Sequence, residues 1–100
     1  MGRVRVDAGR IRDWESFHLA FREAMGFPDS YGDDMDAWID GVLTRAAVEP
    51  GDVLVVEVVK SIGFRGRCPD QFAEMVEGTA YVNLRCIEEG QPPPLALVFV

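Results

Sequence analysis

Five aspartates and no basic residue fall within residues 28–40, a density of carboxylates that could bind a cation or a cationic protein. They supply five of the seven units of net negative charge in a chain of 100 residues. Carboxylates form strong paired hydrogen bonds with arginine when water is excluded, and an acidic cluster speeds the approach of a positively charged partner. The five residues are Asp29, Asp33, Asp34, Asp36 and Asp40.

Part of this cluster has an ordinary structural explanation. The pattern that follows predicts a helix from about Asp33 to about Arg45, so the first acidic residues would lie at its N-terminus. An aspartate in the first turn gains roughly 0.3–1 kcal/mol from the helix dipole and from capping. Each like-charged neighbour one turn away costs only about 0.2–0.5 kcal/mol. Asp33, Asp34 and Asp36 are therefore neutral or favourable on structural grounds, and helix initiation is a sufficient reason for them.

Asp40 is not explained in this way. It lies in the second turn, one turn after Asp36, with no lysine or arginine within reach along the helix, and Gly41 follows it. A glycine inside a helix costs roughly 1 kcal/mol relative to alanine. Two locally unfavourable residues in succession indicate a surface kept for contact, although a solvated acidic face remains the alternative. Thr44 continues the same polar stripe.

The opposite side of this helix is apolar and is expected to face the core. Trp38 lies between the apolar and acidic sides, so its ring could reach the rim of a contact surface. Trp14, Phe17 and Phe21 recur on one face of an earlier helix and are expected in the core together with Trp38.

Metal and enzyme sites are weaker interpretations. An EF-hand would need a central glycine and a closing glutamate, which are missing, and no further ligands for Mg²⁺ stand out. His18, the only histidine, has no nucleophile or second base placed near it by the sequence. Arg65 and Arg67 precede a predicted helix and could hold an anion, although a solvated loop is the favoured interpretation and the two could also pair with acids of the same domain. We therefore expect no metal, no cofactor and no enzymatic activity.

The composition is that of a globular domain. Hydrophobic residues make up 48% and charged residues 27%, and the net charge of -7 argues against nucleic acid as a direct partner. Neither a signal peptide nor an apolar run of membrane-spanning length is evident, so cytoplasmic residence and no membrane contact are expected. Cys68 and Cys86 lack CxxC spacing and are expected to be small, reduced, partly buried side chains.

The predicted elements alternate between strands and helices over one domain, residues 1–100. Asp13 is the expected N-cap of the first helix, and an interruption of the last helix is expected near Gly78. The order implies an α/β fold, with a small three-stranded parallel sheet and flanking helices. The elements are a strand at Val4–Val6, a helix from Trp14 to about Met25, the acidic helix, a turn at Pro50–Asp52, a strand at Val53–Val59, a loop at Ser61–Arg67, a helix from Pro69 toward Glu89, and a strand at Leu95–Val100.

Residues 11–43 resemble the barstar family, intracellular inhibitors of barnase-type ribonucleases. The resemblance is carried by Phe27-Pro28, Tyr31-Gly32, Asp36-Ala37 and Asp40, and more weakly by Glu88-Glu89-Gly90 before the last strand. It implies that the acidic helix and the loop before it occupy the active site of a basic ribonuclease in place of RNA phosphates. Asp36 and Asp40 would be the phosphate mimics, with Asp33, Asp34, Trp38, Thr44 and the Ser30-Tyr31 loop beside them.

The chain also departs from the family pattern. Ser30 replaces a loop tyrosine, Asp34 replaces an asparagine, and Arg85 stands where the family has a glutamate facing the enzyme. These differences predict a cognate ribonuclease with a different surface. Separately, we expect the free protein to be monomeric. The alternative is a barstar-like binding or regulatory module with another basic partner and no nuclease inhibition.

Overall fold

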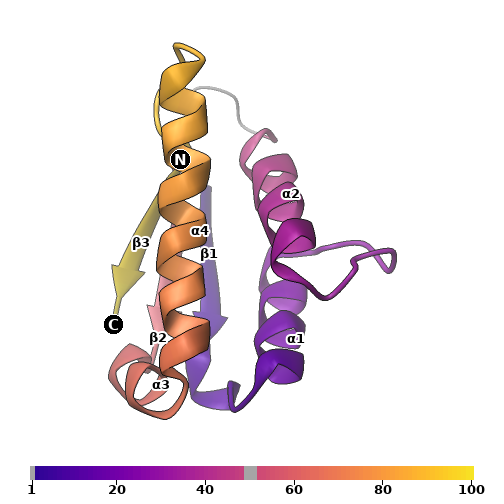
Figure 1. Ribbon diagram of the computed structural model, residues 1–100, viewed down its shortest axis with the longest axis vertical. Helices are drawn as coiled ribbons and strands as arrows, with labels where there is room; N and C mark the ends of the chain where they lie inside the picture. The colour runs from indigo at the N-terminus through magenta and orange to yellow at the C-terminus, as the bar shows by residue number, and fades with distance from the viewer. Residues whose placement is uncertain (1, 49–51) are drawn as a thin grey trace.

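The computed structural model of the chain describes residues 2–48 and 52–100. Figure 1 shows a layer of strands beside a layer of helices. In this part of the chain the elements are β1 (Gly2–Asp7), the 3-10 helix η1 (Ala8–Arg10), α1 (Trp14–Met25), α2 (Met35–Ala46), β2 (Leu54–Val59), α3 (Ser61–Arg67), α4 (Pro69–Glu88) and β3 (Leu95–Phe99).

The three strands form one parallel sheet in the order β1-β2-β3. Val4 is aligned with Val56, and Val56 with Leu97, so branched apolar side chains form a row across the inner face. Because parallel strands need crossovers, the chain must pass through helices between one strand and the next. The predicted α/β fold with a three-stranded parallel sheet is confirmed.

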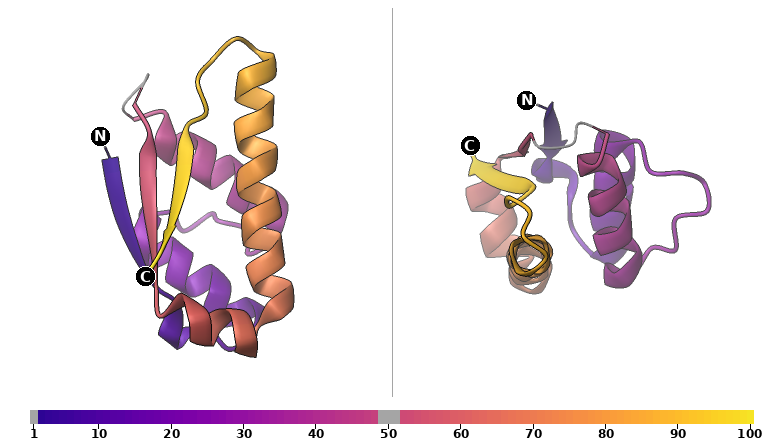
Figure 2. Two further views of the ribbon diagram at one scale, coloured as in Figure 1. Left: turned by 90° about the vertical axis from the view of Figure 1, so that its left-hand side faces the viewer. Right: turned by 90° about the horizontal axis from the view of Figure 1, so that it is seen from above.

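The helices α1, α2 and α4 cover one face of this sheet, as the two views in Figure 2 show. Burial alternates along β1, where Val4 and Val6 point into the core while Arg3 and Arg5 are exposed on the other face. On that open face the guanidinium of Arg3 pairs with Glu57 of β2 at 3.2 Å. The sheet is therefore packed on one side only, and the helices form the opposite surface of the molecule.

The first helix has the boundaries that the sequence predicts. Asp13 caps it, since its carboxylate accepts a hydrogen bond from the backbone N–H of Ser16 at 2.8 Å. The hydroxyl oxygen of Ser16 accepts a hydrogen bond from the backbone N–H of Asp13, which completes a capping box. The helix ends at Gly26, whose φ of 72° is in the left-handed region that glycine adopts without strain.

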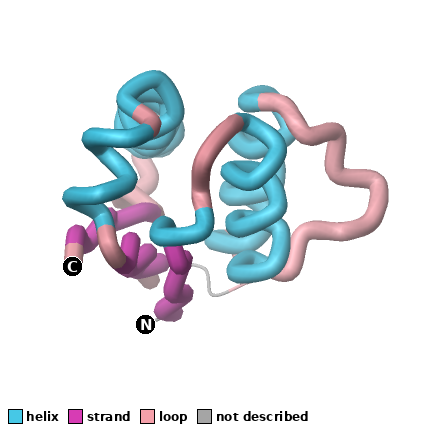
Figure 3. The backbone as a smooth tube through the Cα atoms, turned by 90° about the horizontal axis from the view of Figure 1, so that it is seen from below, coloured by secondary structure: helices cyan, strands magenta, loops and turns pink. Residues whose placement is uncertain are grey.

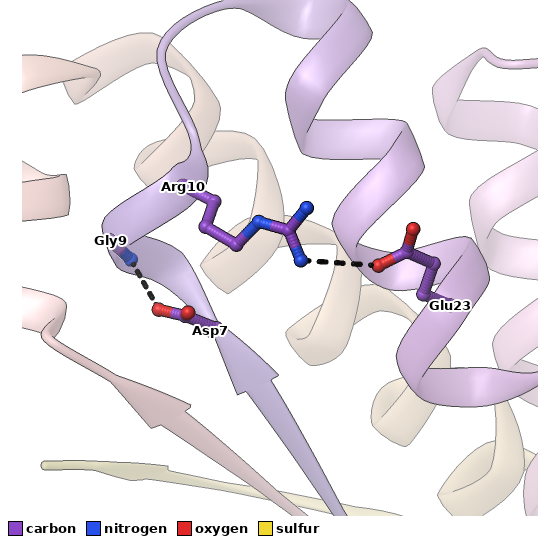
Figure 4. A network of polar contacts seen from close by, with 4 residues as sticks. All are labelled: Asp7, Gly9, Arg10 and Glu23. Atoms are coloured by element: carbon purple, nitrogen blue, oxygen red, sulfur yellow. Dashed lines mark hydrogen bonds and ion pairs between the residues drawn. The ribbon is translucent and has the colours of Figure 1, made fainter.

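A short polar network fixes the turn between β1 and α1 (Figure 4). The carboxylate of Asp7 accepts a hydrogen bond from the backbone N–H of Gly9 at 3.1 Å. The guanidinium of Arg10 then reaches Glu23 on α1, with 3.5 Å between the nitrogen and oxygen atoms. These contacts tie η1 to the helix that follows it.

Two predictions about the second half of the chain are wrong. Residues 61–67, expected as a loop, form the seven-residue helix α3, because Phe64 is fully buried and anchors this helix against the core. The helix expected to break near Gly78 is continuous from Pro69 to Glu88. A Cβ on Gly78 would lie 2.9 Å from the Trp38 ring, so this glycine allows α2 to approach α4 and does not end the helix.

Several smaller differences also appear. The acidic helix begins at Met35 rather than at Asp33. Trp14, expected in the core, is 38% exposed, although its ring contacts Phe17 and stacks on His18. Pro50 and Gly51 of the expected turn lie outside the described residues. Over the residues that the structure does describe, no helix has both the length and the apolar character needed to cross a bilayer.

Candidate functional site: an acidic ridge and its supporting loop

The loop of residues 26–34, which joins α1 to α2, projects from the body of the molecule (Figure 3). Tyr31 anchors it from below, since this side chain is buried and packs against the ring of Phe27 with 4.7 Å between ring centroids. The tyrosine hydroxyl shares a hydrogen bond with Nδ1 of His18 on α1, which is also buried. Tyr31 thus holds the loop to the first helix through its hydrogen bond and ring contact with His18, and the ion pair between Asp29 and Arg22 holds it there at a second point.

Burial sets the protonation behaviour of this pair. Removal from water lowers the pKa of His18, and the nearby carboxylates of Asp33 and Asp34 oppose that shift. Burial also raises the pKa of Tyr31 well above its usual value, and the same two carboxylates add to the effect. Both groups are therefore neutral near neutral pH, and the pair contributes no charge beneath the acidic loop.

The start of α2 is fixed by two of the aspartates. Asp34 is the N-cap, and its carboxylate accepts a hydrogen bond from the backbone N–H of Ala37 at 2.7 Å. Asp33 has a φ of 53°, which places it in the left-handed region that aspartate tolerates better than most side chains. The chain therefore turns sharply at Asp33 and enters the helix at Met35.

The structure separates the five aspartates of the cluster into two groups. Asp29 is paired with Arg22 of α1, with 2.8 Å between the atoms. The other four are exposed, and among the described residues none of them forms an ion pair with a lysine or arginine of this chain. We call these four the acidic ridge: Asp33, Asp34, Asp36 and Asp40.

Gly41 and Thr44 lie further along α2. The hydroxyl of Thr44 donates a hydrogen bond to the backbone carbonyl of Asp40 at 2.9 Å, and the side chain is exposed. A Cβ on Gly41 would lie 2.8 Å from the Phe27 ring, so the glycine is required for the loop to pack on α2. The interpretation of Gly41 as a sign of a contact surface is therefore replaced by a packing reason, and Asp40 alone keeps the functional interpretation.

A groove of about 430 Å³ runs between the loop and α2. Asp40 and Thr44 lie on its helix side, and Ser30 and Tyr31 lie on its loop side. The structure thus brings four of the sequence-predicted site residues to one concave surface next to the acidic ridge.

Two of the predicted site residues lie elsewhere. Trp38 is 1% exposed and its ring packs edge-on against Phe21, so its expected place at a contact rim is wrong and its side chain belongs to the core. The guanidinium of Arg85 lies over the ring of Tyr81, 5.9 Å from its centroid, and near Glu89 at 3.8 Å. The contacts with Tyr81 and Glu89 raise the pKa of Arg85, and all of these partners lie on α4 or at its end.

The two arginines before α4 have structural partners. Arg67 donates hydrogen bonds to the backbone carbonyls of Ile11 at 2.8 Å and Ala8 at 3.0 Å. Arg65 lies over the ring of Phe72 at 5.9 Å from the centroid. The structure thus places both arginines in α3 instead of a solvated loop, and Arg67 bonds to backbone carbonyls instead of to an acid of the domain.

Cysteines and metal ligands were the remaining candidates. Cys68 is buried and Cys86 is half-buried, and both are free thiols, as expected. Within residues 2–48 and 52–100, no three histidine, cysteine, aspartate or glutamate side chains are grouped so that they could hold a metal ion.

Sequence reasoning missed the groove and the His18–Tyr31 contact. His18 lies one position after Phe17 on the buried face of α1, so the helical period gave a signal that it would be buried. No local pattern could show that its partner would be a tyrosine 13 residues later, because that pairing depends on how the loop folds back. The groove likewise depends on the packing of Phe27 against Gly41.

The chain is similar to one known protein family over nearly its whole length. The model of the family described as barstar (barnase inhibitor) matches residues 1–98. No curated protein matches the chain.

Proposed function

Because the chain belongs to the barstar (barnase inhibitor) family, we propose that its acidic ridge fills the cationic active site of a basic ribonuclease. Membership of this family implies an inhibitor of a barnase-like ribonuclease and not an enzyme. Our proposal goes further in assigning the contact to particular residues of this chain. We also place the protein in the cytoplasm, where such an inhibitor would protect the cell that makes the ribonuclease.

One observation carries the proposal. Asp36 and Asp40 are exposed one turn apart on α2, and among the described residues neither is paired with an arginine or lysine of its own chain. Asp29 of the same cluster is paired, with Arg22. The chain thus has the cations to neutralise an aspartate nearby, yet leaves these two carboxylates available to another molecule.

Carboxylates at this spacing suit the chemistry of a ribonuclease active site. An enzyme that binds RNA must present positive side chains to phosphate oxygens, and paired contacts between carboxylate and guanidinium have similar geometry and charge. The separation of about one helical turn between Asp36 and Asp40 lets each reach a different cation. The net charge of -7 also speeds the approach of a basic partner.

The other predicted contact residues take supporting roles in this proposal. Ser30 and Thr44 are exposed beside the ridge and would contact the enzyme directly, whereas Tyr31 is buried and would hold the loop in position. Asp33 and Asp34 would add negative charge at the N-terminal end of the ridge. Trp38 would act only through the core, and Arg85 would meet the enzyme at the edge of the contact.

The proposal is tested with the double variant Asp36→Asn/Asp40→Asn, which removes two charges and keeps side-chain shape. Inhibition of a purified barnase-type ribonuclease and the association rate should be measured over a range of salt concentrations. We expect weaker inhibition, a slower association at low salt, and a smaller decrease of the association rate with added salt.

The matched control is Asp29→Asn, which removes one charge from the same segment but from a carboxylate already paired with Arg22. We expect this variant to bind nearly as well as the unmodified protein. If the double variant inhibits as strongly as the unmodified protein, the ridge is not the interface.

A further inference from the structure

The two outer strands of the sheet protect their free edges to different degrees. Natural proteins place charges on an edge strand to prevent it from pairing with another chain. Half of the residues of β1 are charged: Arg3, Arg5 and Asp7. β3 has no charged residue and no proline, and its side chains Val98 and Phe99 are exposed. The edge of β3 is therefore the one that can accept a further strand.

The direction of the backbone groups of β3 follows from its pairing with β2. Leu54 donates its backbone N–H to the carbonyl of Pro94 at 2.8 Å, and Val100 donates its own to the carbonyl of Val58 at 3.1 Å. Within a strand, the N–H and C=O of one residue point to the same side, and this side alternates from residue to residue. The residues whose backbone groups point to the free edge are therefore Leu95, Leu97 and Phe99.

One residue of this edge already has a partner within the chain. The side-chain amide of Asn83 on α4 accepts a hydrogen bond from the N–H of Leu95 at 3.1 Å and donates one to its carbonyl at 3.0 Å. These are the two bonds that a neighbouring strand would make. In the part of the chain that the structure describes, no strand pairs with β3 on its outer side. The backbone groups of Leu97 and Phe99 thus remain available to another chain.

An apolar surface borders the same edge on the side covered by helices. The ring of Phe72 on α4 contacts that of Phe99, with 5.4 Å between the centroids. Val76 lies one turn after Phe72, on the face of α4 that also carries Asn83, and is 39% exposed. Phe99 is 47% exposed despite its contact with Phe72. A second chain at this edge would therefore remove apolar side chains from water as well as pair backbone groups.

From these features we propose that β3 pairs with β3 of a second copy of this chain, antiparallel and about a two-fold axis at Val98. Leu97 then faces Phe99 of the second copy in two symmetry-related pairs, and each pair exchanges two backbone hydrogen bonds. Val98 meets its counterpart across the axis on the open face of the sheet. On the other face, Leu97 and Phe99 pack against each other as a cross-strand pair.

A second copy fits this edge better than a peptide segment of another protein. An added peptide would satisfy the same backbone groups but would present a new free edge of its own, whereas the two-fold pairing removes both exposed edges. Charge favours the same location. Two copies that each carry a net charge of -7 repel one another, and the residues from Leu95 to Val100 contribute no charged side chain to this repulsion.

The proposal goes beyond the inhibitory surface and leaves that surface free. The loop of residues 26–34 and the C-terminal end of β3 lie on opposite sides of the molecule (Figure 3). A dimer formed through β3 can therefore bind one ribonuclease on each acidic ridge. The monomer expected from the sequence is the alternative that the following experiments distinguish.

Sedimentation equilibrium of the unmodified protein tests the association directly. A short strand pair is a small interface, so we expect a dissociation constant of about 10–100 µM and a mass that rises toward twice that of one chain. Val98→Lys and Val98→Glu should each remain monomeric, because like charges would meet across the axis. An equimolar mixture of the two variants should associate again. The matched control is Val48→Lys, at an exposed valine after α2, which should associate like the unmodified protein.

Hydrogen exchange followed by NMR identifies the contact. The backbone N–H groups of Leu97 and Phe99 should exchange more slowly as the protein concentration rises, whereas that of Val100, already bonded to β2, should not change. A monomer at every concentration up to about ten times the expected dissociation constant would overturn the inference. Association that Val98→Lys does not prevent, or that leaves Leu97 and Phe99 unprotected, would equally overturn it.

The dimer and the proposed inhibitory function fail separately. Folded Val98→Lys, checked by thermal unfolding, should inhibit a barnase-type ribonuclease as strongly as the unmodified protein. Loss of inhibition in this variant would mean that the enzyme, and not a second copy, occupies the edge of β3. Unchanged inhibition by Asp36→Asn/Asp40→Asn would instead reject the ridge as the inhibitory surface, while concentration-dependent association would still support the dimer.

Discussion

Nδ1 of His18 on α1 and the hydroxyl of Tyr31 in the site loop share a buried hydrogen bond that connects the core to the base of the acidic ridge. The ring of Trp14 stacks on the outer side of the imidazole at 5.9 Å between centroids. Asp33 and Asp34 are near enough to oppose the lowering of the His18 pKa. The pKa of His18, the only histidine of the chain, therefore depends on the position of the loop that carries the ridge.

This pair makes folding stability dependent on pH. Because burial lowers the pKa of His18 in the folded protein, the unfolded chain binds a proton first as the pH falls. The neutral imidazole therefore contributes stability above its unfolded pKa, near 6.5, and this contribution is lost as the pH falls from there toward the lowered folded value. Urea unfolding between about pH 8 and about pH 5.5 should show a falling midpoint.

The matched variant for this measurement is His18→Gln, which keeps a polar side chain but does not titrate. It should be less stable than the unmodified protein near pH 8 and should lose less stability on acidification. Equal slopes for the two proteins across this range would contradict a role of His18 in the pH dependence.

A second prediction compares two glycines inside helices, Gly41 in α2 and Gly66 in α3. Alanine normally stabilises a helix by about 1 kcal/mol relative to glycine. Gly41→Ala should instead destabilise the protein by roughly 1–3 kcal/mol, because the new methyl group would meet the buried Phe27 ring. Gly66→Ala in α3 has open space around the added carbon and should be neutral or stabilising. Chemical unfolding of both variants measures the difference, and stabilisation by both would mean that Phe27 does not pack on Gly41.

A third prediction concerns Arg67, which we expect to be structural. Its guanidinium satisfies the carbonyls of Ile11 and Ala8, and hydrogen bonds to a charged group contribute about 1.5–3 kcal/mol. Arg67→Gln should therefore lower the free energy of unfolding by about that amount. The neighbouring Arg65→Gln loses only a contact with the Phe72 ring and should cost less than about 1 kcal/mol. Equal, small losses in both variants would show that the Arg67 bonds add little.

A fourth prediction concerns Arg85, which places a positive charge where the resemblance implies a glutamate facing the enzyme. If the enzyme surface there is basic, Arg85→Glu should tighten binding and raise the association rate at low salt. The control with the same change of charge is Arg12→Glu, an exposed residue before α1. Both variants should gain a little from net charge, but only Arg85→Glu should slow dissociation. A slower association for Arg85→Glu would place Arg85 against an acidic part of the partner.

The sequence by itself determined much of this protein. The alternation of predicted strands and helices along the chain predicted a parallel sheet. Strands joined by helices form right-handed crossovers, and this leaves few other arrangements. The boundaries of α1 followed from local capping at Asp13 and from Gly26, which need no tertiary partner. The exposure of Asp36 and Asp40 also followed from local information, since the period of a helix decides which side chains point away from its apolar stripe.

Only the tertiary structure decided the features that depend on residues far apart in the chain. Gly78 looked like a helix breaker until α2 brought Trp38 against it, and Gly41 looked unfavourable until the loop brought Phe27 against it. Trp38 belongs to the core because two helices close over its ring. Its position on the helix, between the apolar and acidic sides, did not decide whether the ring would be buried or exposed. Because protein interiors are close-packed, the neighbours of a buried side chain depend on how distant elements pack together. The periodicity of a single helix or strand does not show which residues these neighbours are.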